Sequence, residues 1–240
     1  MRKFGLIGKS LSHSFSKGYF TEKFEKLQME AEYVNCELED ISEFESLATE
    51  DFDGWNVTIP YKEAIIPFLD ELTHDAQAIG AVNTISRSDG KLIGHNTDHT
   101  GFEKSLLPFL EPGDTKALIF GTGGASKAVA HAFQRRGIHF AFVSRAPKPG
   151  QLSYDQLNSA VLDNVHLLVN TTPIGMYPNE DDVLPFHMDL IQSHHFVIEL
   201  IYNPSETVLL KVAKQAGARA INGLNMLHWQ AEEAWKIWEG

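Results

Sequence analysis

Cysteine is almost missing from this sequence, which has a single one, Cys36, among its 240 residues. One thiol cannot form an intrachain disulfide or a thiolate metal cluster, so the sequence favours a reducing setting. Long apolar runs are missing as well, because none approaches the roughly 20 residues that a membrane helix needs. The apolar segment after Met1-Arg2-Lys3 is too short for a signal peptide. We therefore expect a cytoplasmic protein with no membrane partner.

Positive charge is scarce, since 20 lysines and arginines face 32 acidic residues and the formal net charge is -12. A field of that sign repels phosphate backbones, which argues against nucleic acid as a partner. Metal-binding patterns are also missing. His95 and His99 stand four residues apart, but the residues around them do not predict a helix, and no H-E-x-x-H motif occurs. We expect no bound metal.

Short apolar runs alternate with longer amphipathic segments, a pattern that predicts an α/β fold. In the first part of the chain, strands are expected at 4–7, 33–38 and 55–58, helices at 16–27, 41–47 and 61–72, and a hairpin at 81–86 and 91–93. The turn of that hairpin is Asp89-Gly90. In the second part, strands are expected at 116–120, 140–143, 167–170 and 196–200, and helices at 126–136, 209–215 and 224–238.

The strands of the second part are apolar on both faces, which predicts a parallel sheet covered by helices. We therefore expect two lobes with a cleft between them. Residues 1–100, completed by a C-terminal helix at 222–240, would form an α/β substrate-binding lobe. Residues 101–221 would form a Rossmann-type dinucleotide-binding lobe.

A glycine-rich turn, Gly121-Thr122-Gly123-Gly124-Ala125, lies between the expected strand at 116–120 and the following helix. In that place backbone N–H groups and the helix N-terminus can bind a pyrophosphate. The third glycine of the usual pattern is Ser126 here, so the match is partial, and a purely structural turn is the alternative.

The next strand ends at Val143-Ser144-Arg145, where an NAD-specific site would carry a carboxylate for the ribose hydroxyls. A small hydroxyl and a guanidinium suit a 2′-phosphate instead, with Lys148 as a possible second charge. The pattern favours NADP over NAD, and a solvated surface arginine is the alternative.

Three polar clusters mark the first lobe: Ser12–Ser16, Asn56–Lys62, and Gly80–Thr84 together with Gly94–Asp98. In an extended segment Ser14 and Ser16 would point the same way and offer two hydroxyls, although a helix cap is the ordinary use of such serines. Lys62 and Asp98 alone would usually be surface charges. Together the clusters offer an ammonium, a carboxylate and several neutral hydrogen-bonding groups, which suits a polyhydroxylated acid.

Several motifs in order resemble shikimate dehydrogenase over nearly the whole chain. In the first lobe they are Ser14-x-Ser16, Asn56-Val57-Thr58-x-Pro60-x-Lys62, Gly80-Ala81-Val82-Asn83-Thr84 and Asn96-Thr97-Asp98. The second lobe adds Gly121-x-Gly123-Gly124-Ala125, Asn170-Thr171-Thr172-Pro173-x-Gly175-Met176, Tyr202-x-Pro204-x-x-Thr207 and Gly223-x-x-Met226-Leu227-x-x-Gln230. The chain departs from the family at Lys17, at Ser144-Arg145-Ala146, and at Glu199, where the family usually has aspartate.

The resemblance implies reversible, NADPH-dependent reduction of 3-dehydroshikimate to shikimate, with Lys62 as acid and base and Asp98 as its partner. It places the substrate against Ser14, Ser16, Asn56, Thr58, Asn83, Thr97, Tyr202 and Gln230. It places NADP against Gly121, Thr122, Gly123, Gly124, Ala125, Ser144, Arg145, Thr171 and Gly223, with Met176, Leu200 and Met226 around the nicotinamide. Leu200 and Met226 could equally be core residues. A monomer or homodimer is expected.

Two other functions remain open. A quinate or quinate/shikimate dehydrogenase would use the same scaffold, with NAD or with both cofactors. A catalytically silent NADP-binding module is the second alternative, but it would have no reason to keep Lys62, Asp98 and the serine pair together.

Overall fold

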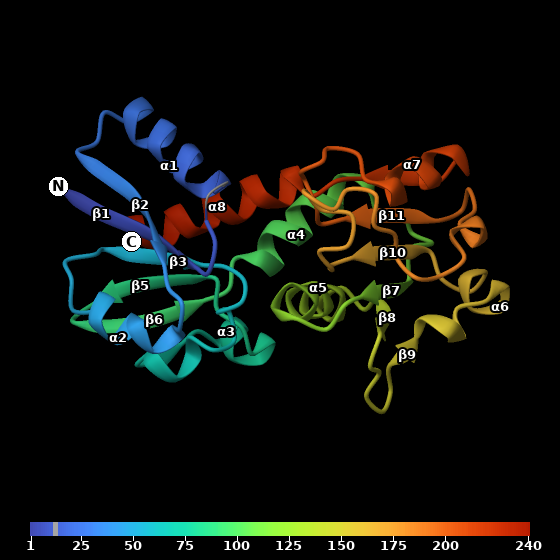
Figure 1. Ribbon diagram of the computed structural model, residues 1–240, viewed down its shortest axis with the longest axis horizontal. Helices are drawn as coiled ribbons and strands as arrows, with labels where there is room; N and C mark the ends of the chain where they lie inside the picture. The colour runs from blue at the N-terminus through green and yellow to red at the C-terminus, as the bar shows by residue number, and fades with distance from the viewer. Residues whose placement is uncertain (12–13) are drawn as a thin grey trace. The chain divides into compact units, whose positions relative to one another are not determined.

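The computed structural model describes residues 1–11 and 14–240, and it divides into two compact units (Figure 1). Unit 1 comprises Met1–Thr97 and Gln230–Gly240, and unit 2 comprises Asp98–Trp229. Ser12 and His13, which belong to the first polar cluster of the sequence, lie outside the described residues. Each unit has its own sheet and its own core.

The sheet of unit 1 is mixed and has the strand order β2-β1-β3-β5-β6-β4. The strands are β1 (Arg2–Gly8), β2 (Ala31–Glu37), β3 (Gly54–Val57), β4 (Glu71–Leu72), β5 (Thr84–Ser88) and β6 (Lys91–His95). Strands β2 and β3 pair in parallel with β1, whereas β5 runs antiparallel to both β3 and β6. Asp89 and Gly90 turn the β5–β6 hairpin with φ of 51° and 77°, which confirms the expected turn.

Helices cover both faces of this sheet because its strands alternate apolar side chains between two cores. Phe4 and Leu6 of β1 pack with α1 (Phe15–Lys26) and with the part of α8 (Leu224–Glu239) that belongs to unit 1. Ile7 packs into the other core, which includes residues of α2 (Phe44–Leu47) and α3 (His74–Ile79).

The sheet of unit 2 is parallel throughout, as expected, with the order β12-β11-β10-β7-β8-β9. Its strands are β7 (Lys116–Phe120), β8 (His139–Ser144), β9 (Leu152–Ser153), β10 (Leu167–Asn170), β11 (Phe196–Glu199) and β12 (Arg219–Ile221). Numbered from the first strand of the unit, this is the 3-2-1-4-5-6 order of the dinucleotide-binding Rossmann fold.

Two helix layers cover the parallel sheet. Helices α4 (Asp98–Leu106) and α5 (Gly124–Arg135) pack on one face, around Phe102, Val129 and Phe133. Helices α6 (Ser159–Leu162) and α7 (Val208–Gln215) pack on the other face. Short 3₁₀ turns lie at Ile41–Glu43, Ile66–Phe68, Leu107–Phe109, Tyr154–Gln156 and Met188–Leu190.

The helix expected at 61–72 is wrong. The segment contains only the 3₁₀ turn Ile66–Phe68 and ends in the short strand β4, which pairs with β6. Pro67 has no N–H to donate inside a helix, so it disfavours a continuous one. Helices α3 and α4 and strands β9 and β12 were not expected either, because each is short and carries a weak apolar pattern.

Membrane spans were also sought in the described part of the chain. Within residues 1–11 and 14–240, no helix has both the length and the apolar character that crossing a bilayer requires.

Candidate functional site

The glycine turn of unit 2 lies where the strand order reverses. Gly121 follows β7 with a φ of 109°, and a Cβ there would lie 2.6 Å from the Thr171 hydroxyl, just past β10. Thr171 in turn donates from its hydroxyl to the Phe120 carbonyl at 2.6 Å. Since β7 and β10 are neighbours whose following connections diverge, this is the topological switch point at which such sheets bind ligands.

Helix α5 begins directly at this turn. Gly123 is its N-cap and provides no side-chain cap, and a Cβ at Gly123 would meet nothing within 4 Å. The first amides of a helix have no partner within the helix, and a 12-residue helix adds a positive end to its dipole. The turn therefore offers N–H groups and open space where a pyrophosphate would lie, so these residues fit a dinucleotide.

The residues predicted to bind the 2′-phosphate lie at the end of β8 and just after it. Ser144 is half-buried and its hydroxyl accepts from the Ala146 N–H at 3.2 Å, whereas Arg145 is exposed. Burial raises the pKa of the neighbouring Tyr154 phenol, and the positive charge of Arg145 partly opposes that rise. Strand β8 pairs with β7, which leads into the glycine turn, and an exposed guanidinium at the end of β8 fits a phosphate ligand.

The other predicted cofactor residues differ in their surroundings. A Cβ on Gly223 would lie 2.0 Å from the Leu200 carbonyl oxygen, so this glycine lets two backbone segments pass in contact. Met176 is 42% exposed and is open to a ligand. Met226 is buried in the α4–α5 core and Leu200 packs against it, which is the core role that the sequence left open.

In unit 1 the predicted substrate residues form a buried network around Asn83. The Asn83 amide donates to the Thr97 hydroxyl at 2.9 Å and to Gln230 Oε1 at 3.4 Å. The side-chain Oδ1 atom of Asn83 accepts from the Thr97 N–H at 2.7 Å. Asn83 is 3% exposed, Thr97 2% and Gln230 8%. The structure thus brings together the three polar residues from β5's start, β6's end and α8.

A second branch of the network runs through Asn56. Its side-chain amide donates to Thr84 Oγ1 at 3.2 Å, and its side-chain Oδ1 atom accepts from the Tyr33 hydroxyl at 2.7 Å. A hydrogen bond to Ser16 also acts on the Tyr33 phenol, whose pKa burial raises well above its usual value. Tyr33 was not predicted, because in the sequence it is one apolar residue of a strand.

The geometry expected for Ser14 and Ser16 is wrong. Ser14 caps α1 and accepts from the Lys17 N–H at 3.3 Å, which is the alternative that the sequence left open, and Ser16 lies in the first helical turn. The two serines therefore do not share the face of an extended strand. Ser16 still reaches the buried network, through Tyr33.

Thr58 and Lys62 are placed by backbone contacts. The Thr58 N–H donates to the Ile7 carbonyl at 2.8 Å, so it continues the line of β3. The Val82 N–H donates to the Lys62 carbonyl at 2.7 Å, which sets the Lys62 backbone beside the residue that precedes Asn83. The Lys62 side chain is half-buried.

One residue of the predicted catalytic pair and one predicted substrate residue belong to unit 2. Asp98 is 5% exposed and is the first residue of α4, a helix that the sequence did not predict. A carboxylate in the first turn of a helix is stabilised by the helix dipole. Tyr202 follows β11, is half-buried, and has a phenol pKa that burial raises.

His95 and His99 have partners of their own. The Nε2 atom of His95 lies 2.9 Å from the Ser86 hydroxyl, and burial lowers the pKa of this imidazole. The Nε2 atom of His99 lies 3.2 Å from the Thr100 hydroxyl.

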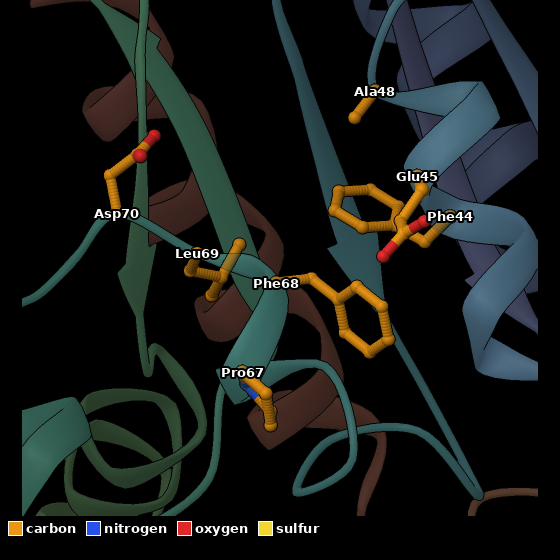
Figure 2. Close-up of a pocket in the computed structure, with 7 residues that line it drawn as sticks. All are labelled: Phe44, Glu45, Ala48, Pro67, Phe68, Leu69 and Asp70. Atoms are coloured by element: carbon orange, nitrogen blue, oxygen red, sulfur yellow. The ribbon is translucent and has the colours of Figure 1, made fainter.

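Two cavities, one in each unit, lie away from these residues. One of about 250 Å³ in unit 1 is lined by Phe44, Glu45, Ala48, Pro67, Phe68, Leu69 and Asp70, and Figure 2 shows the Phe44 and Phe68 rings at its wall. Another of about 380 Å³ in unit 2 is lined by Tyr154, Asp155, Leu157, Pro185, Phe186 and His187. No predicted site residue lines either cavity, so the site rests on the polar network and the glycine turn.

Known proteins resemble this chain along its whole length. A family model described as the shikimate dehydrogenase substrate binding domain matches residues 6–85. A shikimate dehydrogenase (NADP(+)) from Carboxydothermus hydrogenoformans is 38% identical over 254 residues, which cover 98% of this chain and 91% of that protein. Shikimate dehydrogenase from Aquifex aeolicus has a TM-score of 0.89 at 37% identity, covering 100% of this chain and 93% of its own. Shikimate 5-dehydrogenase from Thermus thermophilus, solved with NADP(H) and shikimate, has a TM-score of 0.88 at 30% identity, with 99% and 93% covered.

Proposed function

This chain belongs to the shikimate dehydrogenase family, and from that premise we propose that it catalyses the reversible, NADPH-dependent reduction of 3-dehydroshikimate to shikimate in aromatic amino-acid biosynthesis. One observation carries the proposal. The 3-2-1-4-5-6 sheet places Gly121 and Thr171 together at its switch point, while unit 1 holds a buried network of neutral polar side chains.

The two units would divide the work. Unit 1 would bind the substrate, in line with the family model that matches residues 6–85, and unit 2 would bind NADP. We propose the cytoplasm as the setting, where one thiol and no disulfide are ordinary, and a monomer or homodimer as the assembly.

The substrate is a ring with hydroxyl groups and a carboxylate, so its site needs neutral donors and acceptors held in place. Asn83, Thr97 and Gln230 are buried and hydrogen-bonded to one another, which fixes their orientation before a ligand arrives. Thr58 and Asn56 would extend this set, with Ser14, Ser16 and Tyr202 at the carboxylate.

The cofactor would be held by the glycine turn at residues 121–125, by Ser144 and Arg145 at its adenosine end, and by Thr171, Met176, Leu200, Gly223 and Met226 elsewhere. When bound, NADPH supplies the hydride that reduces the ring ketone. The task left to the protein is to position the ketone, to exclude water and to deliver one proton to its oxygen.

Lys62 is the residue proposed to carry that proton. An ammonium can donate to the carbonyl oxygen as negative charge develops there, and can take the proton back in the reverse direction. Asp98 would be the second member of the pair and would bind the adjacent hydroxyl. Two groups acting together titrate as a pair, so the proton belongs to the pair rather than to one residue.

A cofactor-by-substrate assay tests the proposal. Reduction of NADP would be followed spectroscopically with shikimate and with quinate, and each acid would be repeated with NAD. We expect rapid turnover of shikimate with NADP and much slower turnover in the other three combinations. Comparable turnover of quinate would identify the quinate/shikimate alternative. NADP binding without turnover of either acid would identify the silent module.

A further inference from the structure

A buried acidic residue lies in the cofactor unit outside the predicted site. Glu199 is the last residue of β11 and is 0% exposed. Its Oε2 atom accepts from the Asn170 amide at 3.0 Å and from the Thr207 hydroxyl at 3.2 Å, and its Oε1 atom accepts from the Ile201 N–H at 3.2 Å. Three donors from three segments therefore meet at one carboxyl group.

The first of these segments leads to the glycine turn. Asn170 ends β10, and its side-chain Oδ1 atom accepts from the Thr172 N–H at 3.0 Å and from the Thr172 hydroxyl at 2.7 Å. Thr171, held between them, is the residue that a Cβ on Gly121 would strike. The hydrogen bond that Asn170 donates to Glu199 thus fixes the Asn170 amide, which orients the loop against the cofactor turn.

The other two segments follow β11. Ile201, whose N–H donates to Glu199, lies in the chain between Leu200 and Tyr202. A Cβ on Gly223 would clash with the Leu200 carbonyl oxygen. Thr207 is the N-cap of α7 and accepts from the Leu210 N–H at 3.4 Å. The same carboxyl group therefore fixes both ends of the loop at 200–207.

The donors fit the ionised carboxylate better than the protonated acid. A proton on Oε1 would point at the Ile201 N–H, which cannot accept it. On Oε2 the Asn170 amide could not accept it either, because Thr172 holds the Asn170 side-chain oxygen on the far side. Only the Thr207 hydroxyl could accept the proton, and it would then no longer donate to the carboxyl group. Protonation therefore breaks or reverses one hydrogen bond and removes the negative charge that strengthens the others, so it weakens the contacts that order the two loops.

The Glu199 carboxyl group changes its charge close to neutral pH. Burial raises the pKa of Glu199 to about 7, and the hydrogen bonds from Asn170, Ile201 and Thr207 oppose that rise. The groups that face the carboxyl from β10, from the loop after β11 and from the start of α7 are an amide, a hydroxyl and backbone N–H groups, all of them neutral. Glu206, which precedes α7, pairs at the surface with Lys214.

We propose that Glu199 is a positioning residue for the cofactor: its ionised carboxyl group holds Thr171 and the loop at 200–207 in the conformation that binds NADP. The inference rests on the proposed NADP site of unit 2 and adds a regulator to it. NADP affinity then depends on the fraction of molecules in which this carboxyl group is ionised.

The test compares wild type, Glu199→Gln and the control Glu71→Gln, an exposed glutamate paired with Lys91, by calorimetric titration with NADP between about pH 6 and pH 8. About nine tenths of the wild type is ionised at one pH unit above the pKa and about one tenth at one unit below it. With a protonated form that binds about tenfold more weakly, its Kd should rise about fivefold from pH 8 to pH 6. The 2′-phosphate of NADP also titrates in this range, so the difference between variants is the measured quantity. Glu199→Gln should bind about tenfold more weakly than wild type at pH 8, and the two should converge at pH 6. Glu71→Gln should follow the wild type throughout.

Amide hydrogen exchange of the wild type without NADP gives a second readout, which does not depend on Glu199→Gln folding. Protection of the Thr172 and Ile201 amides, corrected for intrinsic exchange, should fall about tenfold between pH 8 and pH 6. Parallel titration profiles for wild type and Glu199→Gln, or protection that does not change with pH, would overturn the inference and leave the proposed function standing. Failure of the wild type to bind NADP at any pH would overturn both.

Discussion

Gly121 and Gly123 provide a pair of substitutions that separates folding from cofactor binding. At Gly121, alanine would have to adopt a φ of 109° and place its Cβ 2.6 Å from the Thr171 hydroxyl. A backbone conformation of this kind costs about 1–3 kcal/mol for a residue with a side chain. Displacing Thr171 would also weaken its hydrogen bond to Phe120. We expect Gly121→Ala to lower the free energy of unfolding by about 3 kcal/mol, and the Tm by roughly 6–12 °C.

At Gly123 the same change should leave stability alone. Its φ is -85° and a Cβ there would meet nothing within 4 Å. Alanine is a poorer N-cap than glycine by about 0.5–1 kcal/mol, but it restricts the unfolded chain and regains about 0.4–1 kcal/mol. The net change should stay within about 0.5 kcal/mol. The added methyl group, however, would occupy the space in which the pyrophosphate would lie.

Both variants would be studied by urea unfolding and by calorimetric titration with NADP. Gly123→Ala should unfold like wild type and bind NADP at least about tenfold more weakly, which corresponds to about 1.4 kcal/mol. Unchanged NADP affinity in Gly123→Ala would refute the placement of the pyrophosphate at the start of α5. Unchanged stability in Gly121→Ala would refute the argument from backbone strain.

Three further predictions concern charged residues. Lys62→Ala should lower kcat about 10²–10⁴-fold with little change in shikimate affinity, because only the proton transfer is lost. Steady-state kinetics measure both quantities. The control is Lys9→Ala, at an exposed lysine paired with Glu39, and it should behave like wild type. Arg145→Ala should weaken NADP about 10–100-fold and leave NAD nearly unchanged, through loss of a charge-assisted bond to the 2′-phosphate; an unchanged NADP-to-NAD ratio would contradict this role. The pKa of Glu199 is raised from 4.5 to about 7 in the folded chain, so between these pH values the folded chain binds one more proton than the unfolded chain. The contribution of Glu199 to the free energy of unfolding should therefore be greatest below about pH 4.5. It should fall by at most about 3 kcal/mol as the pH rises towards 7. Glu199→Gln should flatten that part of the profile in urea unfolding at a series of pH values.

Much of the fold could be read from local patterns. The apolar run at 116–120, the glycines after it and the amphipathic helix that follows form one βα unit in the structure as in the prediction. The Asp89-Gly90 turn was equally clear, because few residue pairs adopt two positive φ angles. Short elements were missed or misassigned. The segment at 61–72 looked helical by its apolar content, yet Pro67 and pairing with β6 made it a 3₁₀ turn and a strand.

The candidate site divides in the same way. Residues in dense polar motifs, such as Asn83, Thr97 and Gln230, could be selected from the sequence, and the structure joins these three by hydrogen bonds. The pairing of Lys62 with Asp98 stays a prediction. Tyr33 could not be selected, because a single tyrosine in a strand carries no signal of its hydrogen-bond partner 23 residues away.

The sequence by itself determined the class of fold and the glycine turn, because these follow from periodicity and from glycine's missing side chain. From motif order it also predicted which polar residues belong to the site. The tertiary structure alone decided which partners those residues have. Glu199 shows the difference: as a letter it is one more acid in a chain with 32 of them, and only its burial among three donors from separate segments gives it a pKa of about 7. A pKa depends on solvent exclusion and on neighbours in space, and neither is fixed by neighbours in sequence.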